Sequence, residues 1–218
     1  MREIFQADGL AALELAGAVH SFSMNHDFSN RSVLDVGCGT MPYRSLFTSR
    51  GARYVGADIQ GTPDILINAE GTLPLADESV DFVVSFQVLE HVRNVPAYLS
   101  TIRRVLKKGG NMFLSTHGVW PYHPHPTDYW RWTRDGLRAT VEDAGFKVQR
   151  MSALCGPAAW IPMFPMLVCK KLLGPIWPAL APVNLGMNLL MWAADRITPA
   201  AVRDNNAAIL AVEVSRDT

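Results

Sequence analysis

The chain has 218 residues, 49% hydrophobic and 18% charged, and its 20 basic and 20 acidic residues leave a formal net charge of zero at pH 7. This length suits one domain with a buried core, and the composition excludes disordered and collagen-like chains. A neutral chain lacks the positive surface that binds phosphates, so we expect no nucleic-acid partner. Three cysteines without a C-x-x-C pair disfavour a disulfide framework or a metal site and predict a reducing, cytoplasmic setting.

Apolar runs of strand length alternate with helical stretches between residues 32 and 152, a pattern that predicts an α/β domain with a sheet covered on both faces. Helices are predicted to begin near Pro42 and to cover 95–106 and 134–144, the last with Thr133 as its N-cap and Gly145 as its stop. The predicted strands are 32–36, 53–57, 64–67, 80–86, 111–116, 146–151 and 207–214.

Two segments flank or interrupt this pattern. We expect residues 1–29 to form a helical cap over the ligand mouth. Residues 152–205 are predicted to be an apolar insert before the last strand. Between residues 152 and 194 only Lys170 and Lys171 are charged, while six prolines, three glycines and three tryptophans interrupt the apolar sequence.

The insert does not read as one transmembrane helix, because Pro175, Pro178 and Pro182 would break the hydrogen-bond ladder that lipid requires. Broken helices are predicted instead, and Asn184 and Asn188 lie on a narrow polar stripe beside a wide apolar face. Such a face must be covered. It would serve as a lid over the acceptor pocket, as a homodimer interface or as a foot on a membrane surface.

The strongest local signal is the sequence VLDVGCGT at residues 33–40, a buried strand followed by a G-x-G turn. Open α/β sheets bind their ligands at such a turn, where glycines let the backbone approach the ligand. Asp58 lies 21 residues beyond Gly37, at the end of the next predicted strand. A carboxylate in that position accepts hydrogen bonds from ribose hydroxyls.

The choice of cofactor depends on charge. A dinucleotide fingerprint prefers glycine where this chain has Pro42, and Asp35 before the turn would repel a pyrophosphate. The same carboxylate suits the ammonium of a methionyl group, and the turn has no lysine, so it is not a P-loop. The sequence therefore predicts S-adenosylmethionine rather than NAD.

Segments on both sides of the turn and further along the chain strengthen this interpretation. Residues 33–47, 73–85, 88–92 and 102–110 resemble, in order and spacing, the successive motifs of class I S-adenosylmethionine-dependent methyltransferases, and 207–214 resembles the last, antiparallel strand of that family. The resemblance covers about residues 30–152. It implies a Rossmann-like, seven-stranded mixed sheet with helices on both faces.

The resemblance also implies a cofactor site. Asp35, Gly37 and Gly39 would line the methionyl part, Asp58 the ribose, Asn68 and Ala69 the adenine edge, and Phe86 and Gln87 the floor of the site. Cys38 and Ile59, beside these residues, are predicted to belong to the same site. Met41 stands where many family members have glycine.

Residues 120–133, WPYHPHPTDYWRWT, are rich in aromatic residues and histidine and follow the fifth predicted strand, on the expected acceptor side. The segment is similar to one in bacterial methyltransferases that accompany glycosyltransferases in surface polysaccharide and glycolipid assembly. Aromatic rings stack on sugars, and Asp128 and Arg131 would either bond an acceptor or hold the loop as an ion pair.

A hydroxyl acceptor requires a base, and histidine is the usual base near neutral pH. His123 and His125 are the candidates and His117 is a third, although each could instead hold the loop together. We expect a methyltransferase acting on a small-molecule, saccharide or lipid-linked acceptor, cytoplasmic and peripheral on the inner membrane face. An NAD-dependent sugar-modifying enzyme and a non-catalytic methyltransferase-fold subunit are the alternatives.

Overall fold

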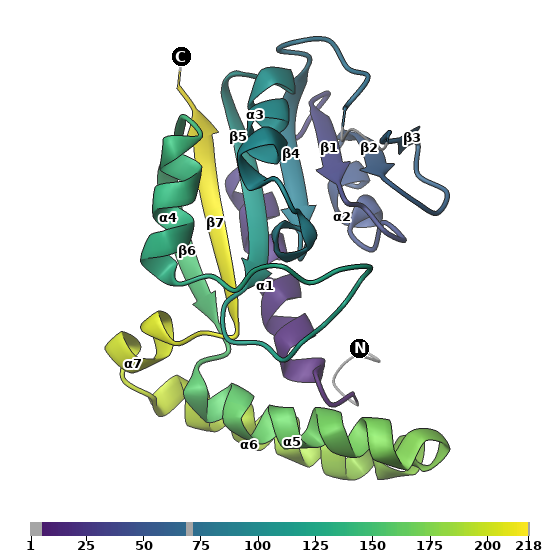
Figure 1. The fold of residues 1–218 in the computed structure, drawn as a ribbon, viewed down its shortest axis with the longest axis vertical. Coiled ribbons are helices and arrows are strands. Elements are labelled where there is room, and N and C mark those ends of the chain that lie inside the picture. The colour runs from purple at the N-terminus through teal and green to yellow at the C-terminus, as the bar shows by residue number, and fades with distance from the viewer. Residues whose placement is uncertain (1–5, 69–71, 218) are drawn as a thin grey trace.

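The computed structural model describes residues 6–68 and 72–217, and its strands form one seven-stranded sheet in the order β3-β2-β1-β4-β5-β7-β6 (Figure 1). β7 runs antiparallel to β5 and β6, and the other pairings are parallel. The predicted sheet and its antiparallel last strand are confirmed. The strands are β1 Ser32–Val36, β2 Arg53–Asp58, β3 Ile65–Leu66, β4 Val80–Phe86, β5 Leu106–His117, β6 Phe146–Leu154 and β7 Ile209–Arg216.

The helices begin and end largely where their caps predict. Thr133 accepts a hydrogen bond from the Gly136 amide at 3.0 Å, and Gly145 ends the same helix with a φ of 82°, a left-handed conformation that glycine adopts without a Cβ clash. The helical elements are α1 Gly9–Asn25, α2 Arg44–Thr48, the 3-10 turn η2 Leu89–His91, α3 Val95–Val105, α4 Arg134–Asp143, α5 Pro157–Leu173, the 3-10 segment η3 Gly174–Leu180, α6 Ala181–Ile197 and α7 Ala200–Asn205.

Successive strand residues face opposite sides, so the sheet has two apolar layers. One layer packs against α3 and α4 through side chains such as Leu99 and Leu137. The other packs against α1, whose Phe22 ring lies 5.1 Å from that of Phe113 and 6.3 Å from that of Phe82. Helix α1 therefore covers a face of the sheet, and none of its residues lines the cavity described below; residues 1–5 of the expected cap lie outside the described residues.

The insert begins after Leu154, slightly later than predicted, and its prolines do divide it into two helices. α5 and α6 pack side by side and lie across the end of the domain toward which the parallel strands point (Figure 1). The Leu10 amide donates to Asn188 Oδ1 at 3.0 Å, and Asn184 and Asn188 are both buried. The predicted polar stripe thus faces the domain and the wide apolar face points outward.

Candidate active site

The glycine turn after β1 is fixed to the end of β2. The Gly37 and Cys38 amides both donate to the Ala57 carbonyl, at 2.8 and 3.2 Å. Gly37 has a φ of 78°, and a Cβ added there would lie 2.3 Å from Val88 Cγ2. Only glycine meets both conditions. No side chain therefore covers the backbone of the turn at residue 37.

Asp58 holds the same turn from the opposite side. Its carboxylate accepts hydrogen bonds from the amides of Gly39 at 2.8 Å, Ile59 at 2.7 Å and Gln60 at 3.3 Å. A carboxylate offers about four acceptor positions, so one remains for a hydroxyl. Asp58 also lines the cavity described below, as the predicted ribose contact requires.

Asp35 lies buried at the end of β1, behind the turn. The Tyr54 hydroxyl donates to its Oδ2, whereas Oδ1 has no hydrogen-bond partner within the described residues. Burial raises the pKa of Asp35 to about 7 and that of the neighbouring Cys38 thiol to about 11. A buried carboxylate oxygen without a donor costs free energy, so this position fits a ligand that brings a positive charge.

Two residues after β4 form the predicted floor of the cofactor site: Phe86, whose ring is packed, and Gln87, whose backbone is strained. Phe86 packs against Tyr43, with ring centroids 4.7 Å apart. Gln87 has a φ of 55°, and its Nε2 donates to Ser115 Oγ at 2.9 Å. Its Oε1 is buried and has no partner among the described residues, so it can accept a hydrogen bond from a ligand.

The predicted adenine edge is only partly described. Asn68 is exposed, and its Oδ1 accepts a hydrogen bond from the Thr72 amide at 2.8 Å. Ala69 lies outside the described residues. Met41 has a φ of 55°, a left-handed conformation that explains the frequent glycine at this position of the family motif.

A cavity of about 600 Å³ opens at the carboxyl ends of β1, β2 and β4. Four predicted cofactor residues line it, whereas five others do not: Asp35, Cys38, Gly39, Asn68 and Phe86. The predicted residues that line it are Gly37, Asp58, Ile59 and Gln87, together with His123 and His125 from the loop after β5. A larger hollow of about 750 Å³, lined by residues such as Asp77 and Arg103, lies at the opposite ends of the strands.

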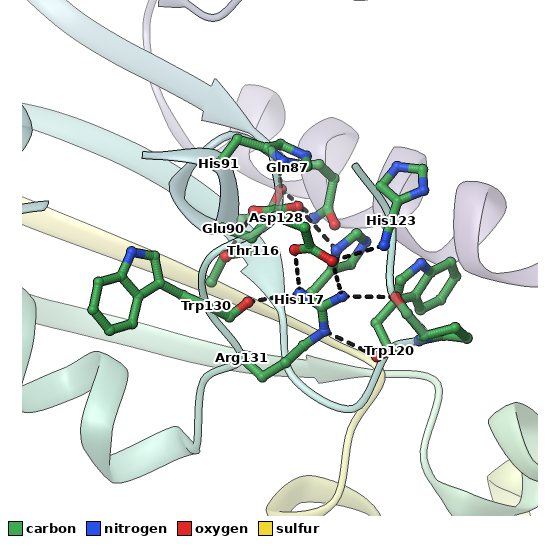
Figure 2. A network of polar contacts seen from close by, with 12 residues as sticks. Gln87, Glu90, His91, Thr116, His117, Trp120, His123, Asp128, Trp130 and Arg131 are labelled. Carbon is green, nitrogen blue, oxygen red and sulfur yellow. Dashed lines mark hydrogen bonds and ion pairs between the residues drawn. The ribbon is translucent and has the colours of Figure 1, made fainter. Parts of the chain in front are cut away.

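The loop of residues 118–133, here called the acceptor loop, is held by Arg131 (Figure 2). Its guanidinium donates to both Asp128 carboxylate oxygens at 2.6 Å and to the carbonyls of Trp120, Pro121 and Trp130 at 2.6–2.9 Å. All five donors of the side chain are therefore used. Arg131 lowers the pKa of Asp128 to about 2, so the pair is charged at neutral pH.

Asp128 also places the histidine that lines the cavity. Its Oδ2 accepts the His123 backbone amide at 2.7 Å. The His123 ring lies 4.4 Å from that of His125 and 5.9 Å from that of His91, and burial lowers the pKa of His123. Within residues 6–68 and 72–217, no set of three His, Cys, Asp or Glu side chains is arranged to hold a metal.

His117 lies deeper, at the end of β5. It is 4% exposed and stacks on Trp120 at 4.7 Å, and its Nδ1 is 3.0 Å from Glu90 Oε1, although the two are not aligned as a hydrogen bond. Burial lowers the pKa of His117 to about 3 and raises that of Glu90, so both groups favour their neutral forms. Thr116 donates to Glu90 Oε2 at 2.8 Å.

Several residues that line the cavity were not predicted from the sequence. Tyr98, Thr101 and Ile102 line it from α3, where spacings of three and four residues place them on one helix face. That periodicity was a usable signal. Val88 and Tyr129 also line the cavity, and each lies in a segment that the sequence analysis assigned to the site, 88–92 and 120–133, although neither residue was named there.

The fold and the site together define a nucleoside-binding α/β domain: a Rossmann-like sheet, a glycine turn after the first strand and an acidic residue after the second. Residues 8–150 match the methyltransferase domain family, which is most of the chain, and the chain belongs to that family. The resemblance predicted from the sequence motifs is confirmed.

A curated relative in Mycolicibacterium smegmatis, a probable S-adenosylmethionine-dependent methyltransferase, is 30% identical over 141 residues, 57% of this chain and 55% of the relative. The chain spans about half the length of the curated relatives it matches.

Two solved structures share the fold. The cyclase SpnF has a TM-score of 0.61 at 15% identity, over 92% of this chain and 81% of its own. Phosphoethanolamine N-methyltransferase 2 of Haemonchus contortus, solved with S-adenosyl-L-methionine, has a TM-score of 0.56 at 14% identity, over 87% and 49%.

Proposed function

We propose that this protein transfers a methyl group from S-adenosylmethionine to an acceptor that binds between the glycine turn and the acceptor loop. The observation that carries the proposal is the cavity that Gly37 and Asp58 share with His123 and His125. One wall thus offers a nucleoside site, and the other offers groups that can accept a proton.

The buried Asp35 carboxylate favours a cationic cofactor over a dinucleotide. Its free Oδ1 suits an ammonium group, whereas a pyrophosphate near the turn would meet a second negative charge. S-adenosylmethionine supplies a methyl group on a positively charged sulfur. We propose that Asp35, Gly37, Cys38 and Gly39 form the methionyl end of its site, Asp58 and Ile59 the ribose position, Asn68 and Ala69 the adenine edge, and Phe86 and Gln87 the floor.

His123 is the proposed base for a hydroxyl acceptor. Burial keeps its imidazole neutral near pH 7, so one ring nitrogen can take the acceptor proton as the oxygen attacks the methyl carbon. His125, which is exposed, is proposed to contact the acceptor or to serve as the base in its place. His117 is too deeply buried to line the cavity with them.

Asp128 and Arg131 are proposed as positioning residues. Every donor of Arg131 already bonds within the loop, so it has no free N–H for an acceptor. The pair instead bonds the backbone of His123, Trp120 and Trp130 and so fixes the loop that carries these side chains, whose aromatic rings can stack on a sugar. Saccharide and lipid-linked acceptors fit this wall. The three free cysteines fit a reducing cytoplasm.

Ligand titration followed by label transfer tests the proposal. We expect the protein to bind S-adenosylmethionine and not NAD, with binding weakened by about 1.5–3 kcal/mol in Asp58→Ala and less in Asp58→Asn, which keeps one oxygen. Retention of NAD alone would overturn the proposal. With an isotopically labelled methyl donor, mass spectrometry of saccharide and lipid fractions then identifies the acceptor.

The same assay separates the histidines. His123→Ala should lower kcat about 10²–10⁴-fold, the usual contribution of a general base, without changing cofactor affinity. The control is His20→Ala, on an exposed position of α1. Cofactor binding without label transfer to any fraction would instead support a non-catalytic methyltransferase-fold subunit.

A further inference from the structure

The hairpin of residues 157–197, formed by α5, η3 and α6, has an unusual surface. It contains ten of the eighteen large apolar side chains that are exposed within the described residues. Water rarely surrounds an apolar surface of this extent without a partner to cover it. The ten exposed side chains are Ile161, Val168, Leu172, Leu173, Ile176, Val183, Leu189, Leu190, Trp192 and Ile197.

The polarity of α6 is reversed relative to a surface helix of a water-soluble domain. Such a helix buries its apolar stripe and exposes its polar face. In α6 the buried residues are Asn184, Asn188 and Met191, and Asn188 bonds the Leu10 amide of α1, whereas Leu189 and Leu190 are more than half exposed. The apolar face therefore suits an apolar medium on the outer side of the hairpin.

The charge of the hairpin favours an anionic surface. Residues 157–197 contain three cations, Lys170, Lys171 and Arg196, and one acid, Asp195, so the hairpin has a net charge of +2 at neutral pH. Lys170 Nζ lies 3.7 Å from Asp8 Oδ1 at the surface, where such a pair contributes little. Both lysines lie beside the turn of the hairpin, here called its tip, where Leu172 is 79% and Ile176 is 64% exposed. Trp192, 44% exposed, lies 4.9 Å beneath the Arg196 guanidinium, and an aromatic ring beside a basic side chain is typical of the headgroup region.

The hairpin can lie on a bilayer but is poorly placed to span one. Residues 157–197 are long and apolar enough to cross a membrane by length and composition. Each helix, however, has 17 residues and is thus about 25 Å long, against a hydrocarbon core of about 30 Å. One flank of the hairpin is also bonded to α1 through Asn188, which fixes it along the domain.

We propose that the outer face of this hairpin docks on an anionic lipid bilayer, with its helices in the plane of the headgroups and Leu172 and Ile176 among the acyl chains. Amphipathic helices bind in this way, through buried apolar area together with basic side chains. Trp160 and Trp177 do not contribute, since Trp160 donates to the Asn206 carbonyl and Trp177 is buried.

Docking would also place the acceptor loop close to lipid. Phe164 of α5 contacts Trp120 of that loop edge to face, with ring centroids 6.0 Å apart, and Trp120 stacks on His117. The hairpin lies at the end of the domain to which the parallel strands point (Figure 1). A lipid-linked acceptor would follow from this arrangement, and that step rests on the proposed function.

Vesicle flotation of the full chain tests the docking without any need for activity. We expect the protein to float with vesicles that contain phosphatidylglycerol and less with phosphatidylcholine alone. The double variant Leu172→Glu/Ile176→Glu should reduce the bound fraction at least about ten-fold, since it buries two carboxylates at the interface. Met24→Glu, on an exposed position of α1, is the matched control.

Lys170→Gln/Lys171→Gln should weaken binding to phosphatidylglycerol vesicles roughly five-fold or more, and salt should do the same. The absence of flotation, or flotation that Leu172→Glu/Ile176→Glu leaves unchanged, would overturn the proposal. A dimer in size-exclusion chromatography that Ile176→Glu converts to a monomer, without vesicle binding, would assign the face to a second copy instead.

Titration of S-adenosylmethionine into the double variant Leu172→Glu/Ile176→Glu distinguishes this proposal from the proposed function. Cofactor affinity should remain unchanged because the hairpin does not line the cavity. Lipid binding by a protein that fails to bind the cofactor would leave the docking intact and overturn the methyltransferase. Cofactor binding without lipid binding would overturn the docking and leave the proposed methyltransferase intact.

Discussion

The two walls of the cavity are built in different ways. The cofactor wall consists of backbone and carboxylates at the ends of β1 and β2, where Gly37 and Asp58 are fixed by hydrogen bonds of the sheet itself. The acceptor wall is a loop without helix or strand, and one side chain, Arg131, ties its two ends together (Figure 2). The first wall is therefore built by the sheet itself. The second wall is anchored by the Tyr129 and Trp130 amides, which donate to the Glu90 carbonyl, and is held together internally by Arg131.

Removal of Arg131 should have the largest effect. Arg131→Gln leaves the Asp128 carboxylate, whose side chain is 3% exposed, without its cation and leaves three loop carbonyls without donors. Breaking a buried pair from one side costs about 3–5 kcal/mol. We expect the free energy of unfolding to fall by that order in urea denaturation.

Arg138→Gln is the matched control, because Arg138 pairs with Glu142 on the exposed face of α4 and such pairs contribute little. In Arg131→Gln the KM for the acceptor should rise while affinity for S-adenosylmethionine stays within about two-fold of the original, measured where the variant is still folded. Equal losses of acceptor and cofactor binding would show that the two walls are not independent.

A substitution in the glycine turn should have a smaller effect on stability but a larger one on the cofactor. Gly37→Ala adds a Cβ 2.3 Å from Val88 Cγ2 at a φ of 78°. Strain and overpacking together should cost roughly 2–3 kcal/mol of unfolding free energy. Affinity for S-adenosylmethionine should fall at least about ten-fold, because the backbone must move away from the ligand.

Gly61→Ala separates the two causes. Gly61 has nearly the same φ, 79°, but a Cβ there would contact nothing within 4 Å. This variant should show the conformational cost alone, about 1 kcal/mol, with unchanged cofactor affinity. If Gly61→Ala were as harmful as Gly37→Ala, contact with Val88 would not be the reason that residue 37 is glycine.

The difference between the cofactor wall and the acceptor wall also explains which features the sequence could predict. The β1 strand, the glycine turn, the Thr133 cap and the Gly145 stop depend on neighbours within a few residues, and all are found as predicted. A helix or turn signal of this kind is local, so periodicity and capping rules suffice.

The rest depends on contacts between distant residues. Asn188 faces inward because its Oδ1 bonds the Leu10 amide, 178 residues away, and a helical pattern alone indicates a polar stripe without its direction. For Arg131 the sequence left both roles open. Its five bonds within the loop, one of them to the carbonyl of Trp120, show that Arg131 holds the loop, and no spacing rule specifies such bonds.

The buried carboxylate on the cofactor wall offers the finest test. Burial raises the pKa of Asp35 from its ordinary value of 3.8 to about 7, so between these values the unfolded chain releases a proton that the folded chain keeps. Asp35 should therefore reduce stability as pH rises from about 4 through about 7, with a slope of at most about 1.4 kcal/mol per pH unit that is halved at the folded pKa and vanishes about one pH unit above it.

Urea denaturation of the original chain and of Asp35→Asn across this range isolates that contribution, since other groups change stability equally in both. The difference should grow by about 1 kcal/mol between pH 6 and pH 7 in favour of Asp35→Asn. Tyr54→Phe removes the donor that lowers the Asp35 pKa and should move the end of the slope to higher pH. Saturating S-adenosylmethionine should move it to lower pH, because a cation beside Oδ1 favours the carboxylate. An unchanged slope with bound cofactor would place the ammonium away from Asp35 and leave the turn and Asp58 as the contacts that the cofactor wall provides.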